Sequence, residues 1–205
     1  MITADYCQAF AVYNGWMNRK LYEAAAQLSD DARKADRGAF FRSIHSTLNH
    51  ILWGDRLWLG RFNGQQYATG AVGVDLYDDF GELLAARRAH DDDIGAWAAS
   101  LTDAALAGPL TWYSAMRQQH ISRPRWVCVV QMFNHQTHHR GQATTLLMQA
   151  GIDPGVTDFP FAPMVRDATG RIVMGEAFGL TESGVGSRES GVGRHDAAAV
   201  GGAED

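Results

Sequence analysis

Apolar residues recur every three or four positions in four long stretches of the sequence, a spacing that places them on one face of a helix. The stretches run over residues 5–28, 40–62, 79–106 and 124–150. Residues that end helices follow the later stretches, at Gly64, Gly108, Pro109 and Gly151. The pattern predicts an all-α fold, a four-helix bundle in which each stretch buries its apolar face.

The connections between these stretches differ in length and composition. The second and third stretches are joined by a long connection with Gly70 and Gly73, which favours a crossover over a tight turn. Residues 110–123 are predicted to form a short β-hairpin before the last helix. Glycine, serine, alanine and charged residues dominate from residue 167 onward, with little apolar surface to bury. We expect one domain over residues 1–166 and a disordered tail over residues 167–205.

The overall composition excludes several classes of protein. Hydrophobic residues make up 46% and charged residues 20% of the chain, which is typical of a globular domain. The net charge of −5 and the absence of a basic cluster argue against nucleic acid as a partner. No apolar run approaches the ~18–20 residues that a membrane helix needs. The chain starts without the features of a signal peptide, and Cys7 and Cys128 have the apolar neighbours of free thiols, so we expect a cytoplasmic protein.

The last helical stretch carries closely spaced histidines at 135, 138 and 139. At about 100° per residue, His135 and His139 point together into the apolar face, whereas His138 points toward its edge. Two imidazoles on adjacent turns of one face are close enough to share a metal ion. The spacing therefore indicates a metal site built on His135 and His139.

A catalytic zinc-type site uses three protein ligands and leaves one position open. The second stretch offers His50, at the margin of its buried face, while His45 projects from nearly the opposite side. A lone histidine in an amphipathic helix is more often a core or surface residue than a ligand. The residues alone thus select His50 as the third candidate and leave that alternative open.

Several segments together resemble the DinB family. They are residues 13–18 (YNGWMN), 47–59 (TLNHILWGDRLWL), 134–142 (NHQTHHRGQ) and 151–160 (GIDPGVTDFP). The resemblance covers about residues 5–165 in the same order, and the string His-x3-His-Arg-Gly-Gln is its most specific part. It implies a four-helix bundle with a long crossover, frequent homodimers, and a metal centre of His50, His135 and His139. The wider superfamily includes thiol S-transferases that use low-molecular-weight thiols, and metal-dependent hydrolases or isomerases.

We expect the site to hold one divalent transition metal, zinc or nickel, because imidazole suits both ions. Five further residues are expected to line the pocket or to orient the ligands: Asn14, Asp55, His138, Arg140 and Gln142. Asp55 falls within an apolar face and needs a partner, for which Arg140 and Arg56 are the candidates. The sequence assigns no catalytic residue.

Two functions fit these features. The first is a metal-dependent enzyme, of thiol S-transferase or hydrolase type, that uses bound water or a thiolate on a small electrophilic molecule. The alternative is a non-catalytic metal-binding module that acts as a dimer in interactions or in stress response; a helical scaffold without metal is a third reading. We expect a homodimer also because Trp16 and Trp97 fall outside a single apolar stripe.

Overall fold

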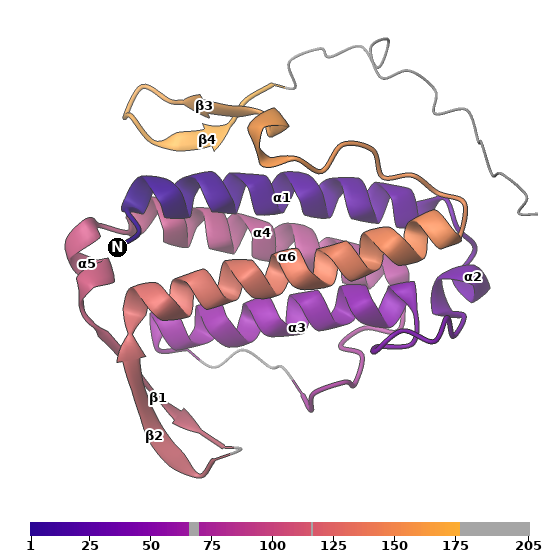
Figure 1. Cartoon of the computed structure of the whole chain (residues 1–205), viewed down its shortest axis with the longest axis horizontal. Helices are drawn as coiled ribbons and strands as arrows, with labels where there is room; N and C mark the ends of the chain where they lie inside the picture. Colours follow the sequence, from indigo (N-terminus) through magenta and orange to yellow (C-terminus); the bar gives the residue numbers. More distant parts are fainter. Residues whose placement is uncertain (66–69, 116, 177–205) are drawn as a thin grey trace, which may run out of the picture.

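Four long helices lie side by side in the computed structural model, which describes residues 1–65, 70–115 and 117–176 (Figure 1). The long helices are α1 (Ala4–Ala26), α3 (Ile44–Asn63), α4 (Phe80–Ser100) and α6 (Arg125–Gln149). Short helices precede α3 and follow α4, namely α2 (Asp30–Lys34) and α5 (Asp103–Ala107). Helix α1 packs against α4 and α6, and α3 packs against the same two helices. The prediction of a mostly helical chain is confirmed.

Capping side chains determine where α3 and α5 begin. At both places the helix bounds predicted from the sequence were wrong. Helix α3 begins at Ile44 rather than at residue 40, because the Ser43 hydroxyl accepts a hydrogen bond from the Ser46 backbone N–H. The third stretch is broken after Ser100, because Thr102 caps α5 by accepting a hydrogen bond from the Ala105 backbone N–H. Both helix starts therefore follow a hydroxyl side chain.

The apolar interior consists of two larger clusters separated by buried polar side chains, and a small third cluster of Tyr13, Met17 and Ala162. The larger cluster nearer the connection between α5 and α6 contains, among others, Cys7, Leu59, Ile94, Leu110, Met132 and Phe133. The cluster nearer α2 contains, among others, Leu21, Leu48, Leu52, Leu83, Ala143 and Leu147. Between them on every long helix lie the residues of a polar belt, which we define as Asn14, Asn18, Asp55, Arg87, Asp91, Gln136 and Arg140.

Two antiparallel hairpins flank the helices. Strands β1 (Pro109–Ser114) and β2 (Gln119–Pro124) pair in the register Pro109↔Pro124 to Ser114↔Gln119, which confirms the predicted hairpin. A 3-10 turn, η1 (Phe159–Phe161), leads to β3 (Met164–Arg166) and β4 (Ile172–Met174), which lie along α1 (Figure 1).

The second hairpin crosses the predicted domain boundary at residue 166. Arg166 forms an ion pair with Asp5 (2.5 Å), and the Ile172 backbone N–H donates to Gln8 Oε1 (2.9 Å). These contacts join the second hairpin to α1, and strand β4 lies within the range predicted as tail, residues 167–205. The rest of that predicted tail, residues 177–205, lies outside the described residues. None of the described helices combines the length and the apolar character that crossing a membrane requires.

Several side chains of α3 hold the long connection between α3 and α4, and Asn49 makes the most hydrogen bonds to it. Asn49 Oδ1 accepts hydrogen bonds from the backbone N–H groups of Leu76 (2.9 Å) and Tyr77 (3.0 Å). Asn49 Nδ2 donates to the Tyr77 carbonyl (3.1 Å), and His45 Nε2 lies 2.8 Å from the same carbonyl. His45 is thus buried against this connection and turned away from His50, as expected.

Candidate metal centre

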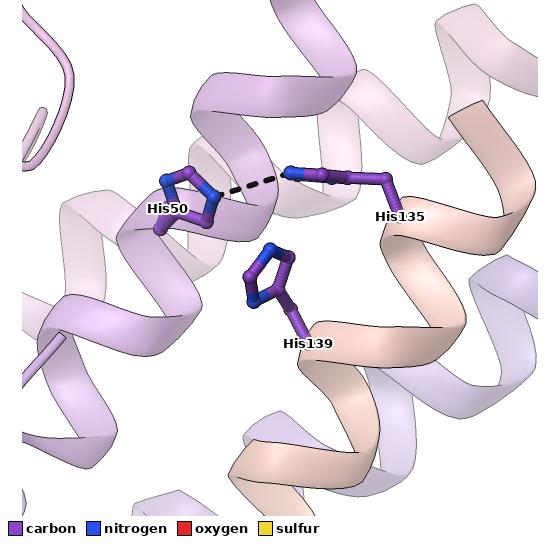
Figure 2. Close-up of side chains that lie close together, drawn as sticks. All are labelled: His50, His135 and His139. Atoms are coloured by element: carbon purple, nitrogen blue, oxygen red, sulfur yellow. Dashed lines mark hydrogen bonds between the residues drawn. The ribbon is translucent and has the colours of Figure 1, made fainter. Parts of the chain in front are cut away.

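Three histidines from two facing helices converge in one place. His135 and His139 lie one turn apart on α6, and His50 reaches them from α3 (Figure 2). One ring nitrogen from each lies within 4.8 Å of the others, and His50 Nε2 is 3.2 Å from His135 Nε2. The ring centroids are 5.1 Å apart for His50 and His135, and 4.5 Å for His50 and His139. The structure thus brings together the three residues that the sequence had selected.

The close approach of α3 to the His135 ring depends on Gly54. A Cβ atom at Gly54 would lie 2.4 Å from His135 Cε1 and 2.8 Å from His135 Nδ1. Glycine inside a helix costs about 1 kcal/mol relative to alanine. At this position the missing side chain makes the space that the imidazole occupies.

A short hydrogen-bonded chain fixes the ring of His139. His139 Nδ1 lies 2.7 Å from Gln142 Oε1, an atom that can only accept, so Nδ1 carries the proton and Nε2 keeps its lone pair. Gln142 Nε2 in turn lies 3.3 Å from Nε2 of His138, an exposed side chain. Figure 2 shows one nitrogen of His139 turned toward the gap between His50 and His135. Gln142 therefore orients His139, and His138 stands outside the cluster.

Aromatic rings cover His50. Phe41 stacks on it at 3.8 Å between centroids with an interplanar angle of 19°. Trp53, one turn along α3, lies nearly parallel to the same ring at 5.6 Å and 16°. His50 and His139 are only 8% and 9% exposed, whereas His135 is partly exposed, so the cluster is covered on the side of His50 and His139.

All three imidazoles are neutral at pH 7. Burial, followed by the proximity of His139 and His135, lowers the pKa of His50 to about 3. Burial, followed by the proximity of His139, lowers the pKa of His135 to about 4. Burial also lowers the pKa of His139, against the opposing effect of its hydrogen bond to Gln142. Neutral imidazole is the form that binds metal ions.

The geometry suits a shared cation. Two nitrogens bound to one tetrahedral zinc ion at ~2.0–2.1 Å lie ~3.3 Å apart. The separation of 3.2 Å between His50 Nε2 and His135 Nε2 is close to that value. The site offers three nitrogen donors, and all three are neutral. Imidazole nitrogens of this kind are ligands for zinc, nickel, copper or iron.

The remaining predicted residues lie in the polar belt and do not touch the imidazoles. Asp55 is fully buried, and its partners are Arg87 Nη1 (2.6 Å) and Gln136 Nε2 (2.8 Å). The prediction that Arg140 or Arg56 pairs with Asp55 was therefore wrong. Arg140 Nη1 donates to Asn14 Oδ1 instead, and Arg56 donates to the Tyr77 hydroxyl.

Sequence reasoning missed four members of the belt, namely Asn18, Arg87, Asp91 and Gln136. Arg87 follows Leu83 by four positions and precedes Ile94 by seven, so it lies on the buried stripe of α4. That spacing could have revealed it. Gln136 carried no comparable signal, because it is a polar residue beside a histidine in a helix with several others.

The aromatic residues that suggested a homodimer pack within the chain. Trp97 is 6% exposed and stacks on Phe62 with centroids 5.0 Å apart. Trp16 contacts Tyr13 and lies under the Lys20 ammonium group. Trp97 thus belongs to the core, Trp16 is partly exposed, and the homodimer stays a prediction.

Comparisons with known proteins agree with these features. The model of the DinB family matches residues 1–170. Protein DinB of Bacillus subtilis (strain 168) is 21% identical over 171 residues, which cover 76% of this chain and 92% of that protein. Among solved structures, a DinB-like protein from Bacillus cereus ATCC 10987 matches with a TM-score of 0.53 and 20% identity. The match covers 69% of this chain and 91% of that chain, and it shows a shared fold.

Proposed function

Because this chain belongs to the DinB family, we propose that it is a metal-binding protein in which His50, His135 and His139 hold one divalent transition-metal ion. Zinc and nickel are the proposed ions, since three imidazoles suit both. The observation that carries the proposal is the convergence of three neutral ring nitrogens within 4.8 Å. The same proposal takes the four long helices as a four-helix bundle with residues 64–79 as its long crossover.

We propose further that the bound metal serves an enzyme of thiol S-transferase or hydrolase type. A divalent ion held by neutral ligands keeps its full positive charge and can acidify a bound water or thiol. The chain supplies orientation, since Gln142 holds the His139 ring, and it limits water, since Phe41 covers His50. The substrate class is a small electrophilic molecule.

The proposal extends to the setting of the protein. A homodimer and a cytoplasmic location are part of it. The two cysteines are free and buried, at 0% and 3% exposure for Cys7 and Cys128, which suits a reducing compartment.

One observation favours the alternative of a non-catalytic metal-binding module. Phe41 stacks directly on one candidate ligand, and both His50 and His139 are more than nine-tenths buried. A metal held in so covered a place stabilises the fold without needing a substrate. Catalysis requires instead that Phe41 leave a coordination position accessible.

Metal content and turnover test the two functions. The purified protein is stripped with a chelator and reloaded with zinc or nickel, and elemental analysis and melting temperature are measured. We expect one ion per chain and a stabilisation of about 2.7 kcal/mol at a free metal concentration 100 times the Kd. His135→Ala removes both effects, whereas His120→Ala, a change on exposed β2, removes neither.

Loaded protein is then assayed with a panel of low-molecular-weight thiols and electrophilic acceptors, and with small hydrolysable esters and amides. Turnover that requires metal and His135 supports the enzyme. Full metal loading with equal inertness of wild type and His135→Ala supports the non-catalytic module. Absence of metal binding by the wild type would refute the metal centre itself.

A further inference from the structure

The polar belt forms a continuous chain of contacts through all four long helices. Asp55 on α3 accepts from Gln136 on α6 and from Arg87 on α4, at 2.8 and 2.6 Å. Arg87 Nη2 also forms an ion pair with Asp91 Oδ1 on its own helix, at 2.8 Å. Asp55 therefore joins three helices through a single carboxylate.

The chain of contacts returns to α6 by way of α1. Asp91 Oδ1 accepts hydrogen bonds from Asn18 Nδ2 (2.8 Å) and Asn14 Nδ2 (3.3 Å). Asn14 Oδ1 then accepts from Arg140 Nη1 on α6. The belt is thus a chain of contacts that begins and ends on α6, at Gln136 and Arg140.

These two α6 residues stand in a fixed relation to the metal-site histidines. Gln136 directly follows His135, and Arg140 directly follows His139. Successive residues of a helix point about 100° apart, so two residues one turn apart define the rotation of the helix about its axis. Holding Gln136 toward α3 and Arg140 toward α1 therefore fixes the direction in which His135 and His139 point.

Stability alone gives a weak reason for such a belt. Its two arginines and two aspartates sum to zero charge, and a buried ion pair is often no more stabilising than apolar residues of similar volume. Within the described part of the chain, Gln136 Oε1 and Arg87 Nε have no hydrogen-bond partner. Apolar side chains at these positions would have continued the two clusters on either side.

We propose that the polar belt is an orienting device and that Gln136 is its key positioning residue. Through its hydrogen bond to Asp55, Gln136 sets the rotation of α6 about the helix axis and the alignment of α6 with α3. The three imidazoles therefore face one another. The effect of Gln136 on metal affinity rests on the metal centre proposed above. Its effect on the direction of the imidazoles does not.

The test variant is Gln136→Met, which keeps the length and volume of the side chain and removes the donor to Asp55. The matched control is Val129→Ala, which removes buried volume from the same helix outside the belt. The metal-free proteins are compared by the ¹⁵N–¹H signals of the histidine rings at constant pH. We expect the His50 and His135 signals to shift in Gln136→Met and to keep their wild-type positions in Val129→Ala.

Cobalt binding gives the second measurement. Replacing a residue that supports a metal ligand typically weakens affinity ~10–100-fold. We expect Gln136→Met to bind Co²⁺ at least ~10-fold more weakly with an altered visible spectrum, and Val129→Ala to bind it like the wild type. If Gln136→Met does not fold, Gln136→Asn is used in its place, because its shorter arm cannot reach Asp55.

The outcomes separate this inference from the metal centre. Unchanged histidine signals in Gln136→Met would overturn the orienting role, even if metal binding were intact. Shifted signals in Gln136→Met alone support that role, even if the wild type bound no metal and the proposed function failed. Equal shifts in Gln136→Met and Val129→Ala would also overturn it, because any loss of packing would then suffice.

Discussion

The His135 imidazole lies against the backbone of α3, and only the absence of a side chain at Gly54 allows it to do so. The atom that an added Cβ would meet, Cε1, is at the far end of a side chain that can rotate. The helix backbone therefore need not move, and the imidazole is the part that gives way. A substitution at Gly54 is therefore expected to alter the geometry of the site and to leave the fold stable.

Gly54→Ala should abolish metal binding without unfolding the protein. The helix gains up to about 1 kcal/mol from the alanine, but the new methyl group displaces the His135 ring from the cluster. Urea unfolding of the metal-free protein and a zinc titration measure the two effects.

Gly95→Ala is the control for this prediction, because an added Cβ there meets no atom within 4 Å. It should raise the free energy of unfolding by a similar amount and leave zinc affinity unchanged. If Gly54→Ala bound zinc as tightly as the wild type, zinc binding would not depend on the position that His135 has in the structure.

At the scale of single residues, helical spacing predicted the pair of His135 and His139 and offered His50 as a candidate, and the resemblance to the DinB family added His50 to the ligands. Neither predicted the partners of the surrounding residues. The wheel separated His135 and His139 from His138 because an angle around a helix depends on sequence alone. The partner of Asp55 could not be found in the same way. Arg87 lies on another helix, and spacing within one helix does not say which helix lies beside it.

Among the elements, the connection between α3 and α4 depends most on one side chain. Asn49 is 1% exposed and binds the connection through both ends of its amide. An ionised aspartate of the same size could accept from the two backbone N–H groups but could not donate to the carbonyl.

Asn49→Ala should lower the free energy of unfolding by about 2 kcal/mol, because it leaves the Leu76 and Tyr77 N–H groups without their acceptor. Urea denaturation of the metal-free protein measures the loss. Asn134→Ala, at an exposed asparagine of α6, should change stability by less than about 0.5 kcal/mol. Equal effects of the two changes would contradict the role assigned to Asn49.

Elements were predicted well where their signal was local and long. The four helical stretches carry such signals, and the structure contains them; the first hairpin was predicted from few residues and is also present. The break after Ser100 was missed because apolar residues continue at helical spacing through Leu106. The β3–β4 hairpin was missed because its strands have three residues each and are held by contacts with Gln8 and Asp5, far away in sequence.

For the whole molecule, the lowered pKa values of the clustered histidines predict a loss of stability in mild acid. The unfolded chain takes up protons on these rings below pH ~6.5, while the folded protein keeps His50 and His135 neutral down to pH about 3 and about 4. The contribution of these neutral rings to the free energy of unfolding is therefore complete above pH ~6.5, and it is lost progressively as the pH falls toward 4.

Melting temperatures of the metal-free protein between pH 7 and 5 measure this dependence. We expect a steady decrease, and a smaller one in His50→Gln, which has one histidine fewer to protonate. If the pKa of His50 were not lowered in the folded state, the melting temperatures of the wild type and of His50→Gln would fall with pH at the same rate.

The parallel rings of Trp53 and His50 give the site a built-in optical reporter. An indole that lies nearly parallel to an imidazole, with centroids 5.6 Å apart, responds to a charge placed on that ring, whether a proton or a bound cation. Among the six tryptophans of the chain, Trp53 would thus change its emission when the proposed centre is filled, with no dye or label attached.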